Sequence, residues 1–185
     1  AKGIILVEGW AEEILIPAIA KKMGKDLTEH EVSIVNVGST AYMRYAKVFM
    51  RQNQEPMGCK VSIVTDLDVR PQDDGTFDNA VEATALTDKT STIDVTHYPE
   101  IKWSVAKQWT LEWCLWKSTL LGSIFKEAAA EVHNRTFKNA GVVVPDAEFE
   151  QKLMNKLRGY NVNANGGHDS VAKFDKVEVA YKMAQ

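Results

Sequence analysis

Two short apolar runs, each followed directly by acidic residues, constrain the fold of this chain most strongly. The pattern is Ile4–Val7 before Glu8 and Glu12, and Val61–Val64 before Asp66 and Asp68. Both runs are rich in β-branched residues and too short for helices, so they predict strands of a sheet that is covered on both faces. Open α/β sheets carry their chemistry just beyond the carboxyl ends of such strands. The sequence therefore predicts an acidic site at one edge of a mainly parallel sheet.

The four carboxylates are the oxygen ligands that a hard divalent cation such as Mg²⁺ binds, and because such an ion keeps much of its water, few protein ligands suffice. Gly9 permits a sharp turn after Glu8, and Glu12 then projects from the first turn of a helix. Asp66 and Asp68 can both reach one ion only if the strand has given way to a loop. The alternative is structural, because acids are common in first helical turns and in solvated loops.

Length and composition are those of one domain with a sizeable core. The 185 residues are 45% hydrophobic and 25% charged, and no run approaches the ~20 apolar residues that cross a bilayer. We therefore expect a cytoplasmic protein without a membrane partner. The chain starts at Ala1 without a leader-like segment, so we expect a piece of a longer protein. Cys59 and Cys114 are too few and too far apart for a zinc motif and are expected as buried free thiols.

Charge is unevenly distributed, although the net charge is only −3. Residues 1–116 carry 12 Lys and Arg against 17 Asp and Glu, whereas residues 117–185 carry 10 against 8. The total does not favour a general nucleic-acid binder, but a mildly basic C-terminal third beside an acidic metal site can accommodate a phosphate backbone. Solvated helix faces show the same pattern, which is the alternative interpretation.

The expected elements alternate between strand and helix before helices dominate. Ala11–Met23 is expected as a helix with a kink or a late start at Pro17, and residues 31–37 as the next strand. Gly38 and Ser39 open a second helix. Two strand–helix units ahead of a further strand imply a mainly parallel sheet with right-handed crossovers.

Past Pro71 the pattern is less regular. The remaining expectations are a polar insertion at 72–92, strands at 93–97 and 101–106, helices at 111–121, 123–136, 146–158 and 172–184, and a loop at 161–167. We therefore expect an α/β core over residues 1–106, which contains the insertion, and a helical extension over 107–185 that completes the active site.

The acidic motifs resemble those of the Toprim fold, a Rossmann-like α/β fold that topoisomerases, bacterial primases and some nucleases share. Glu8-Gly9 follows one strand, and Asp66-Leu67-Asp68 follows a later one. Three longer segments are similar in sequence to the C-terminal Toprim domain of the overcoming-lysogenisation-defect (OLD) nucleases, namely Leu6–Ala18, Val35–Gly38 and Val64–Asp68. This resemblance implies an N-terminal ABC-type ATPase in the same parent chain and a homo-oligomer formed through that ATPase.

Two later motifs extend the resemblance. Thr110-Leu111-Glu112 resembles the family's Thr-Leu-Glu motif, whose acid joins the metal site. Lys176–Ala180 resembles a late segment whose lysine serves catalysis, and Lys173 is the alternative lysine there. Each residue also has a structural interpretation that does not use the resemblance. Glu112 can be an ordinary acid in the first turn of a helix, and Lys176 can be a solvated surface lysine.

The resemblance to the OLD nucleases implies a metal-dependent endodeoxyribonuclease that nicks or cleaves DNA. Two-metal phosphodiester hydrolysis places two divalent cations, Mg²⁺ or Mn²⁺, about 3.5–4 Å apart, so at least one carboxylate bridges them. Ca²⁺ can occupy such a site as well. The expected ligands are Glu8 and Glu12 on one ion, Asp68 and Glu112 on the other, and Asp66 on both. Lys176 is expected to stabilise the charge of the pentavalent phosphate, so Lys176, Glu8 and Asp66 are the expected catalytic residues.

Other functions are compatible with parts of the sequence. A Toprim module can bind nucleic acid or protein without cutting, but such modules tend to lose the metal acids, which are all present here. Asp66-Leu67-Asp68-Val69 also resembles the nucleophile motif of haloacid-dehalogenase-like phosphatases, although that motif normally lies on the first strand of its domain. A topoisomerase is disfavoured because the chain has no room for a separate domain with a nucleophilic tyrosine.

The aromatic and histidine residues mostly have structural interpretations. Trp109, Trp113 and Trp116 recur at helical spacing, which favours core packing over base stacking. His168 lies in the loop rich in Asn and Gly and is the one histidine expected as a phosphate contact. Trp10 stands where many relatives of the family have a small or polar residue.

Overall fold

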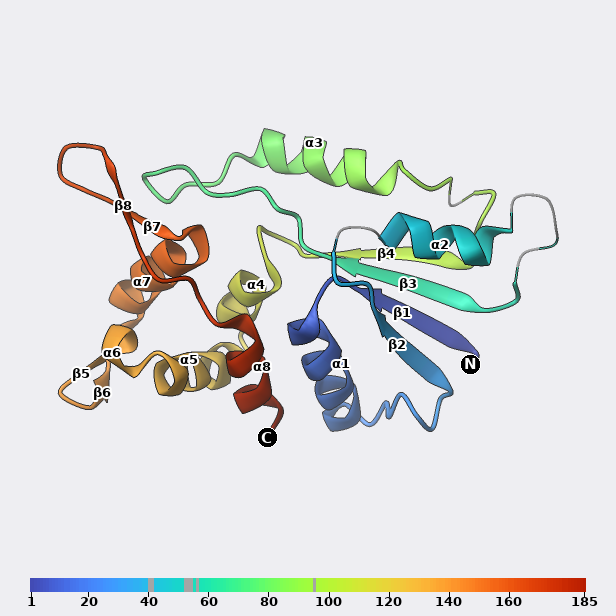
Figure 1. Ribbon diagram of the computed structural model, residues 1–185, viewed down its shortest axis with the longest axis horizontal. Helices are drawn as coiled ribbons and strands as arrows, with labels where there is room; N and C mark the ends of the chain where they lie inside the picture. The colour runs from blue at the N-terminus through green and yellow to red at the C-terminus, as the bar shows by residue number, and fades with distance from the viewer. Residues whose placement is uncertain (40–41, 52–54, 56, 95) are drawn as a thin grey trace.

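The computed structural model describes residues 1–39, 42–51, 55, 57–94 and 96–185. A parallel sheet forms one part of the molecule, and helices make up most of the other (Figure 1). The strands of this sheet are β1 (Gly3–Val7), β2 (Val32–Asn36), β3 (Lys60–Thr65) and β4 (Ile101–Val105), in the order β2-β1-β3-β4. The β1–β2, β1–β3 and β3–β4 pairings are all parallel, which confirms the predicted α/β class.

Helices follow most of the strands and fill the C-terminal part. Their bounds are α1 (Trp10–Lys22), α2 (Tyr42–Met50), α3 (Asn79–Thr90), α4 (Leu111–Lys117), α5 (Gly122–Val132), α6 (Asn134–Phe137), α7 (Asp146–Arg158) and α8 (Lys176–Ala184). Two small antiparallel pairs join β5 (Lys138–Asn139) to β6 (Val142–Val143) and β7 (Tyr160–Val162) to β8 (His168–Ser170). Within the described ranges, no helix is long and apolar enough to span a bilayer.

Buried apolar side chains form two clusters. One cluster packs α2 against the sheet and includes Leu6, Val61, Ile63 and Ile101. The other joins α4, α5, α7 and α8 and contains Trp113, Phe125, Phe137, Phe149 and Leu153. Ala11 and Leu15 of α1 belong to this second cluster, so α1 lies beside α8 and connects the sheet to the helical part (Figure 1).

Side-chain caps fix the starts of the two helices that carry the later motifs. Thr110 Oγ1 accepts the N–H of Trp113 at 3.3 Å and begins α4. A carboxylate oxygen of Asp175 accepts the N–H of Glu178 at 3.0 Å and begins α8. Each cap satisfies a backbone donor that the first helical turn leaves free. Glu112 and Lys176 consequently lie in first turns, at defined positions.

The structure corrects several expected elements in the first half of the chain. α1 begins at Trp10 and continues through Pro17 instead of starting late. The strand expected at 93–97 is wrong for its described residues, because Asp94 accepts the N–H groups of Thr96 and His97 and forms a turn. Val95 lies outside the described residues. The polar stretch expected as an insertion contains a complete helix, α3, which Asp78 caps.

The C-terminal half also differs in its boundaries. α4 ends at Lys117 because Ser118 is extended, and the helix expected over 123–136 divides into α5 and α6 at His133. α8 starts four residues later than expected because Asp175 is its cap. The segment expected as a loop at 161–167 overlaps the end of β7, and its remaining residues connect β7 to β8.

Gly122, at the start of α5, is held against the end of α4. A Cβ atom there would lie 2.6 Å from the backbone carbonyl oxygen of Trp116. We expect Gly122→Ala to lower the free energy of unfolding by about 2 kcal/mol or more, because backbone must shift to make room. Urea denaturation measures the change. Gly58→Ala is the control, since nothing lies within 4 Å of its Cβ position, and equal stabilities would contradict the close packing at Gly122.

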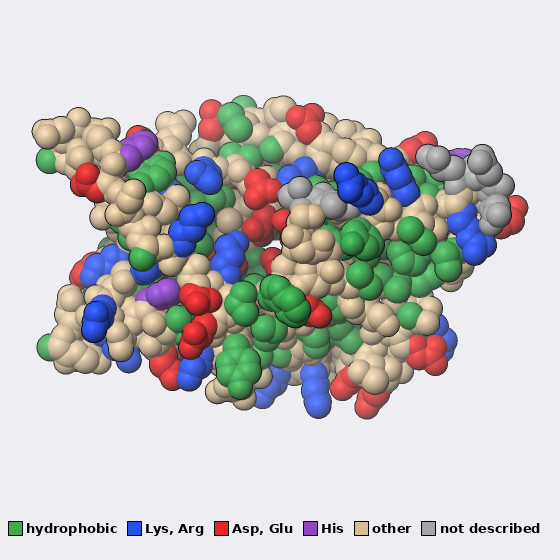
Figure 2. Space-filling view, viewed as in Figure 1, with side chains coloured by type: hydrophobic (Ala, Val, Ile, Leu, Met, Phe, Trp, Pro, Cys, Tyr) green, Lys and Arg blue, Asp and Glu red, His purple; other side chains and the backbone are tan. Residues whose placement is uncertain are grey.

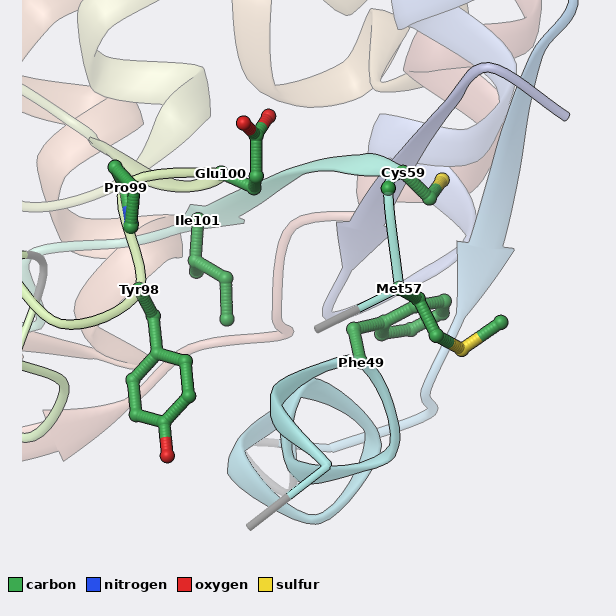
Figure 3. Close-up of a pocket in the computed structure, with 8 residues that line it drawn as sticks. Phe49, Met57, Cys59, Tyr98, Pro99, Glu100 and Ile101 are labelled. Atoms are coloured by element: carbon green, nitrogen blue, oxygen red, sulfur yellow. The ribbon is translucent and has the colours of Figure 1, made fainter. Parts of the chain in front are cut away.

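A cavity of ≈ 250 Å³ lies between α2 and the beginnings of β3 and β4 (Figure 3). Phe49, Met57, Tyr98 and Ile101 give it mainly apolar walls, and the side chain of Glu100 points away from them. This end of the sheet is opposite to the carboxyl ends of the strands, where the predicted acids lie. Apolar walls do not supply ligands for a charged substrate, and the predicted acids lie at the other end of the sheet.

Candidate active site

The acids predicted from the sequence come together at the carboxyl ends of β1 and β3. Glu8 directly follows β1, Asp66 directly follows β3, and Glu12 and Glu112 lie in the first turns of α1 and α4. Glu12 interacts electrostatically with Glu8 and Glu112, and Asp66 interacts with both Glu12 and Glu112. Figure 2 shows acidic side chains gathered beside a hollow between the sheet and the helical part, with basic side chains around it.

Lys176 reaches into this group of acids from the first turn of α8. Its Nζ atom lies 2.8 Å from Oε2 of Glu112 and 3.5 Å from Oδ2 of Asp66. The Glu112 side chain is only 3% exposed, and its Oε1 atom is buried without a hydrogen bond from any described residue. Burial alone would lower the pKa of Lys176, but the carboxylates of Glu112 and Asp66 outweigh it and raise the pKa. Lys176 therefore remains an ammonium ion at neutral pH.

Asp66 is the most deeply perturbed acid of the site. Burial raises its pKa from 3.8 to about 7, against the opposing effect of Lys176. Its Oδ1 atom accepts the N–H of Leu111 at 2.7 Å, which fixes the carboxylate between β3 and α4. Burial also raises the pKa of Glu8 and that of Glu12, although the Thr65 hydroxyl donates a hydrogen bond to Glu8. So many buried carboxylates are unfavourable without a cation to offset their charge.

Asp68 lies at the edge of this group and has a different lysine partner. The chain has left the strand by this point, since β3 ends at Thr65 and Asp68 has a φ of 64°. Lys89 of α3 places Nζ 2.7 Å from Oδ2 of Asp68 and 2.6 Å from the carbonyl oxygen of Asp66. The Asp68 side chain is 55% exposed, so it faces the open side of the site.

Sequence reasoning missed two residues of this site, Thr65 and Lys89. Thr65 precedes Asp66 directly, but a hydroxyl at the end of a strand has no distinguishing pattern. Lys89 is separated from Asp68 by a polar stretch that was expected only as an insertion. Only the placement of α3 over this end of the sheet brings its ammonium group to Asp68.

Other predicted contacts lie elsewhere. Lys173 is exposed, and in the described part of the chain it makes no ion pair with the acids. Nε2 of His168 lies 3.0 Å from Oδ2 of Asp73, and its ring stacks on Tyr160 with 4.1 Å between centroids. His168 therefore ties the β7–β8 pair to the loop after β3. Cys59 and Cys114 are free thiols, as predicted, but both are only partly buried.

The three tryptophans at helical spacing are structural, as predicted. Trp109 and Trp113 are 3% and 2% exposed, and their ring centroids lie 5.7 Å apart. Trp116 packs on Phe149 with 4.7 Å between ring centroids. Trp109 is not helical, however, because it precedes α4 and has a φ of 48°.

The donor set fits a hard divalent cation, although the acids are not arranged as a closed site. As they are placed, no three Asp, Glu, His or Cys side chains of the described residues are grouped so that they could enclose a metal ion. Lys176 and Lys89 instead contact three of the acids. Such a cation prefers oxygen ligands, which these acids provide. It would also offset the cost of burial that raises the pKa values of Glu8, Glu12 and Asp66, and it would give the buried Oε1 atom of Glu112 a partner.

A parallel sheet of this order, with acids after β1 and β3, places the protein in the Toprim class of α/β folds. Residues 1–68 match the family model described as "Overcoming lysogenization defect protein-like, TOPRIM domain". This match confirms the resemblance read from the sequence. A comparison with curated protein sequences gave no match.

Solved structures show the same fold over the whole chain. The C-terminal region of the Burkholderia pseudomallei OLD protein is similar at a TM-score of 0.53 and 20% identity, covering 100% of this chain and 87% of that one. The C-terminal region of the Xanthomonas campestris pv. campestris OLD protein, phased with iodine, is similar at 0.55 and 19%, covering 100% and 84%. The chain as a whole therefore has the fold of these C-terminal regions.

His133 connects α5 to α8 through a neutral imidazole. Its Nε2 atom accepts the backbone N–H of Asp175 at 3.0 Å, next to Lys176. Burial lowers the pKa of His133, with a contribution from Lys156, so the folded pKa lies below the ordinary 6.5. The unfolded chain therefore binds the proton more tightly, and stability is lost as the pH falls from 6.5 through the folded pKa.

We expect the stability lost between neutral and mildly acidic pH to be roughly 1 kcal/mol smaller in His133→Gln than in wild type. Glutamine keeps a hydrogen-bond acceptor but does not titrate. Urea denaturation at neutral and mildly acidic pH measures the difference. His97→Gln is the control because this histidine is exposed. Identical pH profiles for wild type and His133→Gln would contradict the assignment.

Proposed function

We propose that this chain is the catalytic part of a metal-dependent endodeoxyribonuclease that hydrolyses phosphodiester bonds by a two-metal mechanism. The observation that carries the proposal is the position of Lys176, whose ammonium group lies between the buried carboxylates of Glu112 and Asp66. Acids with a lysine among them are the groups that phosphodiester hydrolysis needs. The OLD-like Toprim match over residues 1–68 supports a nucleic-acid-related function.

In this proposal two cations, Mg²⁺ or Mn²⁺, would be held by Glu8, Glu12, Asp66, Asp68 and Glu112. When bound, the cations supply a nucleophilic water at neutral pH and stabilise the charge of the leaving oxygen. The chain holds the ligands in place beforehand. The Thr65 hydroxyl orients Glu8, the N–H of Leu111 orients Asp66, and Lys89 holds the loop that carries Asp68. These contacts limit how far the ligands must move when cations bind.

Lys176 contributes electrostatically and not as a base. Because its pKa is raised, it remains charged and has no lone pair with which to accept a proton. A permanent positive charge next to the scissile phosphate stabilises the additional negative charge of the transition state. Its 40% exposed side chain can move toward a substrate that enters from solvent.

The backbone beside the acids is strained in a way that supports a functional role. Asp68 and Trp109 both have positive φ values, and the N–H of Asp68 donates to the carbonyl of Trp109 at 2.9 Å. Residues in this region of φ and ψ are costly and cluster at functional sites. Here they connect the loop after β3 to the start of α4, which together carry Asp66, Asp68 and Glu112.

The proposal extends to the rest of the parent protein. The two structures compared above are C-terminal regions of OLD proteins, so in those proteins another part precedes this fold. We propose that an ABC-type ATPase precedes it in the parent of this chain as well, that the parent is a cytoplasmic homo-oligomer, and that the ATPase gates cleavage of DNA.

Plasmid cleavage tests the proposed activity. Supercoiled plasmid should become nicked or linear when the chain is incubated with Mg²⁺ or Mn²⁺, and EDTA should prevent this. Intact plasmid and intact single-stranded DNA under all these conditions would contradict the proposal. Calorimetric titration with Mn²⁺ then separates the alternatives, because a non-catalytic Toprim module with a degenerate site would not bind the ion. Turnover of an aryl phosphate without DNA cleavage would instead favour a phosphatase.

A further inference from the structure

The ammonium group of Lys89 is surrounded by oxygen atoms at the end of β3. Its Nζ atom lies 2.6 Å from the carbonyl oxygen of Asp66, 2.7 Å from Oδ2 of Asp68 and 3.4 Å from Oγ1 of Thr65. An ammonium group has three N–H donors, so these three oxygens use all of them. Lys89 therefore has no donor left for a substrate phosphate, whereas in the described part of the chain Lys176 contacts only two carboxylates.

The three oxygens are of the kinds that bind hard divalent cations. They belong to a carboxylate, a backbone carbonyl and a hydroxyl, and all come from residues 65–68. Hard cations take oxygen ligands, carboxylates and backbone carbonyls among them. Asp68 is also one of the five acids proposed above to hold the two cations. Lys89 thus contacts an oxygen that one of these cations would need.

The helix that carries Lys89 directs its side chain into the site. Lys89 lies in the last turn of α3, and its side chain is only 17% exposed although no described residue of α3 is buried. Phe77, just before the helix, packs on Trp109 and Trp113. Ile93, just after the helix, is 3% exposed. Because both ends of α3 are anchored in this way, the ammonium group can leave the site by a movement of the lysine side chain alone.

The loop that carries Asp68 has anchors besides Lys89. The backbone N–H of Asp68 donates to the carbonyl oxygen of Trp109 at 2.9 Å. At the start of the same segment, the carbonyl oxygen of Thr65 accepts the N–H of Ala106 at 2.8 Å. Replacing the lysine therefore leaves the loop attached to the segment between β4 and α4, and Asp68 remains in place as a ligand.

We propose that Lys89 occupies the position of one of the two cations and competes with that cation for Asp68. A divalent cation and an ammonium group on the same carboxylate repel each other, so the cation binds when the lysine side chain has turned toward solvent. The apparent affinity of this cation is lowered in proportion to the fraction of molecules in which the position is free. The inference rests on the proposed function and deepens it, because it makes occupancy of the second cation position, and therefore cleavage, depend on the concentration of divalent cations.

Calorimetric titration with Mn²⁺ tests the competition without using activity. Wild type should bind one ion more weakly than the other, and Lys89→Met should tighten the weaker step by about tenfold or more. The tighter step should change little. Lys89→Arg keeps the positive charge and should leave the weaker step weak. Lys107→Met is the control, because Lys107 is an exposed lysine just after β4, and it should bind Mn²⁺ as wild type does.

Chemical acetylation of wild type gives a second readout that needs no substitution at Lys89. In EDTA the ion pair with Asp68 and the low exposure should protect the amine of Lys89. Mn²⁺ should raise acetylation of Lys89, measured by mass spectrometry, by about tenfold, whereas Lys107 should react equally in both conditions. A Lys89 that stays protected while two ions are bound would overturn the inference. So would a Lys89→Met variant that unfolds like wild type but binds Mn²⁺ no more tightly, because a lysine that only positions Asp68 predicts weaker binding.

Plasmid cleavage measured in parallel separates failure of this inference from failure of the proposed function. Mn²⁺-dependent cleavage by wild type whose Lys89 remains protected would overturn the competition and leave the nuclease intact. Tighter Mn²⁺ binding by Lys89→Met, without cleavage of any DNA by either protein, would support the competition and contradict the nuclease. Absence of Mn²⁺ binding in both proteins would contradict both.

Discussion

Asp66→Asn is expected to reduce metal-dependent DNA cleavage by about a thousandfold or more while making the protein more stable. Activity falls because the substitution removes the charge of the carboxylate proposed to bridge both cations. Stability rises because this carboxylate is 11% exposed and lies among other acids, so its charge is costly in the folded protein. Asparagine keeps the oxygen that accepts the N–H of Leu111.

The gain in stability should depend on pH in a defined direction. The folded pKa of Asp66 is about 7, against 3.8 for an ordinary aspartate, so the unfolded chain loses its proton first as the pH rises. Wild type then loses stability between these two values, by up to about 1.4 kcal/mol for each pH unit. Asp66→Asn should therefore match wild type near pH 4 and exceed it near neutral pH, in urea denaturation with EDTA.

Asp88→Asn is the matched control, because Asp88 is an exposed aspartate of α3. It should leave both cleavage and stability unchanged. An Asp66→Asn variant that cleaves plasmid at the wild-type rate would contradict the proposed site. A variant that loses activity together with stability would show that Asp66 maintains the fold instead.

Lys176→Met is expected to lower the cleavage rate by about a hundredfold to a thousandfold. It should also destabilise the protein, because it leaves the charge of Glu112 buried without its partner. We expect a loss of about 2 kcal/mol, which is less than for a fully buried pair since the lysine is 40% exposed. Thermal and urea denaturation measure the loss.

The double variant Lys176→Met with Glu112→Gln separates the two effects. Removing both charges should recover most of the stability, because no unpaired buried charge remains. It should not recover cleavage, because both a proposed ligand and the stabilising ammonium group are gone. Lys173→Met is the matched control on an exposed lysine of the same segment. Loss of cleavage in Lys173→Met but not in Lys176→Met would show that the alternative lysine is the functional one.

The sequence predicted the sheet because its strands are short β-branched runs separated by helix-length segments. The ends of β1 and β3 follow from the same pattern, since a carboxylate directly after such a run must lie at the edge of the sheet. Helix boundaries in the C-terminal half were less accurate because tertiary contacts set them. His133, for example, separates α5 from α6 and accepts the N–H of Asp175 from across the chain.

The site was predictable where its residues belong to motifs. Glu8, Asp66 and Glu112 each stand at a strand end or in a capped helical turn, positions that local sequence specifies. Lys89 was not predictable, because nothing in a polar helix indicates which lysine will face an acid of another segment.

Diffraction from crystals grown with Mn²⁺ tests most directly whether the acids around Asp66 hold two divalent cations. We expect two anomalous peaks about 3.5–4 Å apart, with Asp66 as the ligand common to both. We also expect that Lys176 turns away from Asp66 toward the side where a phosphate would bind. Crystals that show no peak among Glu8, Glu12, Asp66, Asp68 and Glu112, or a single peak that Asp66 does not contact, would contradict the account.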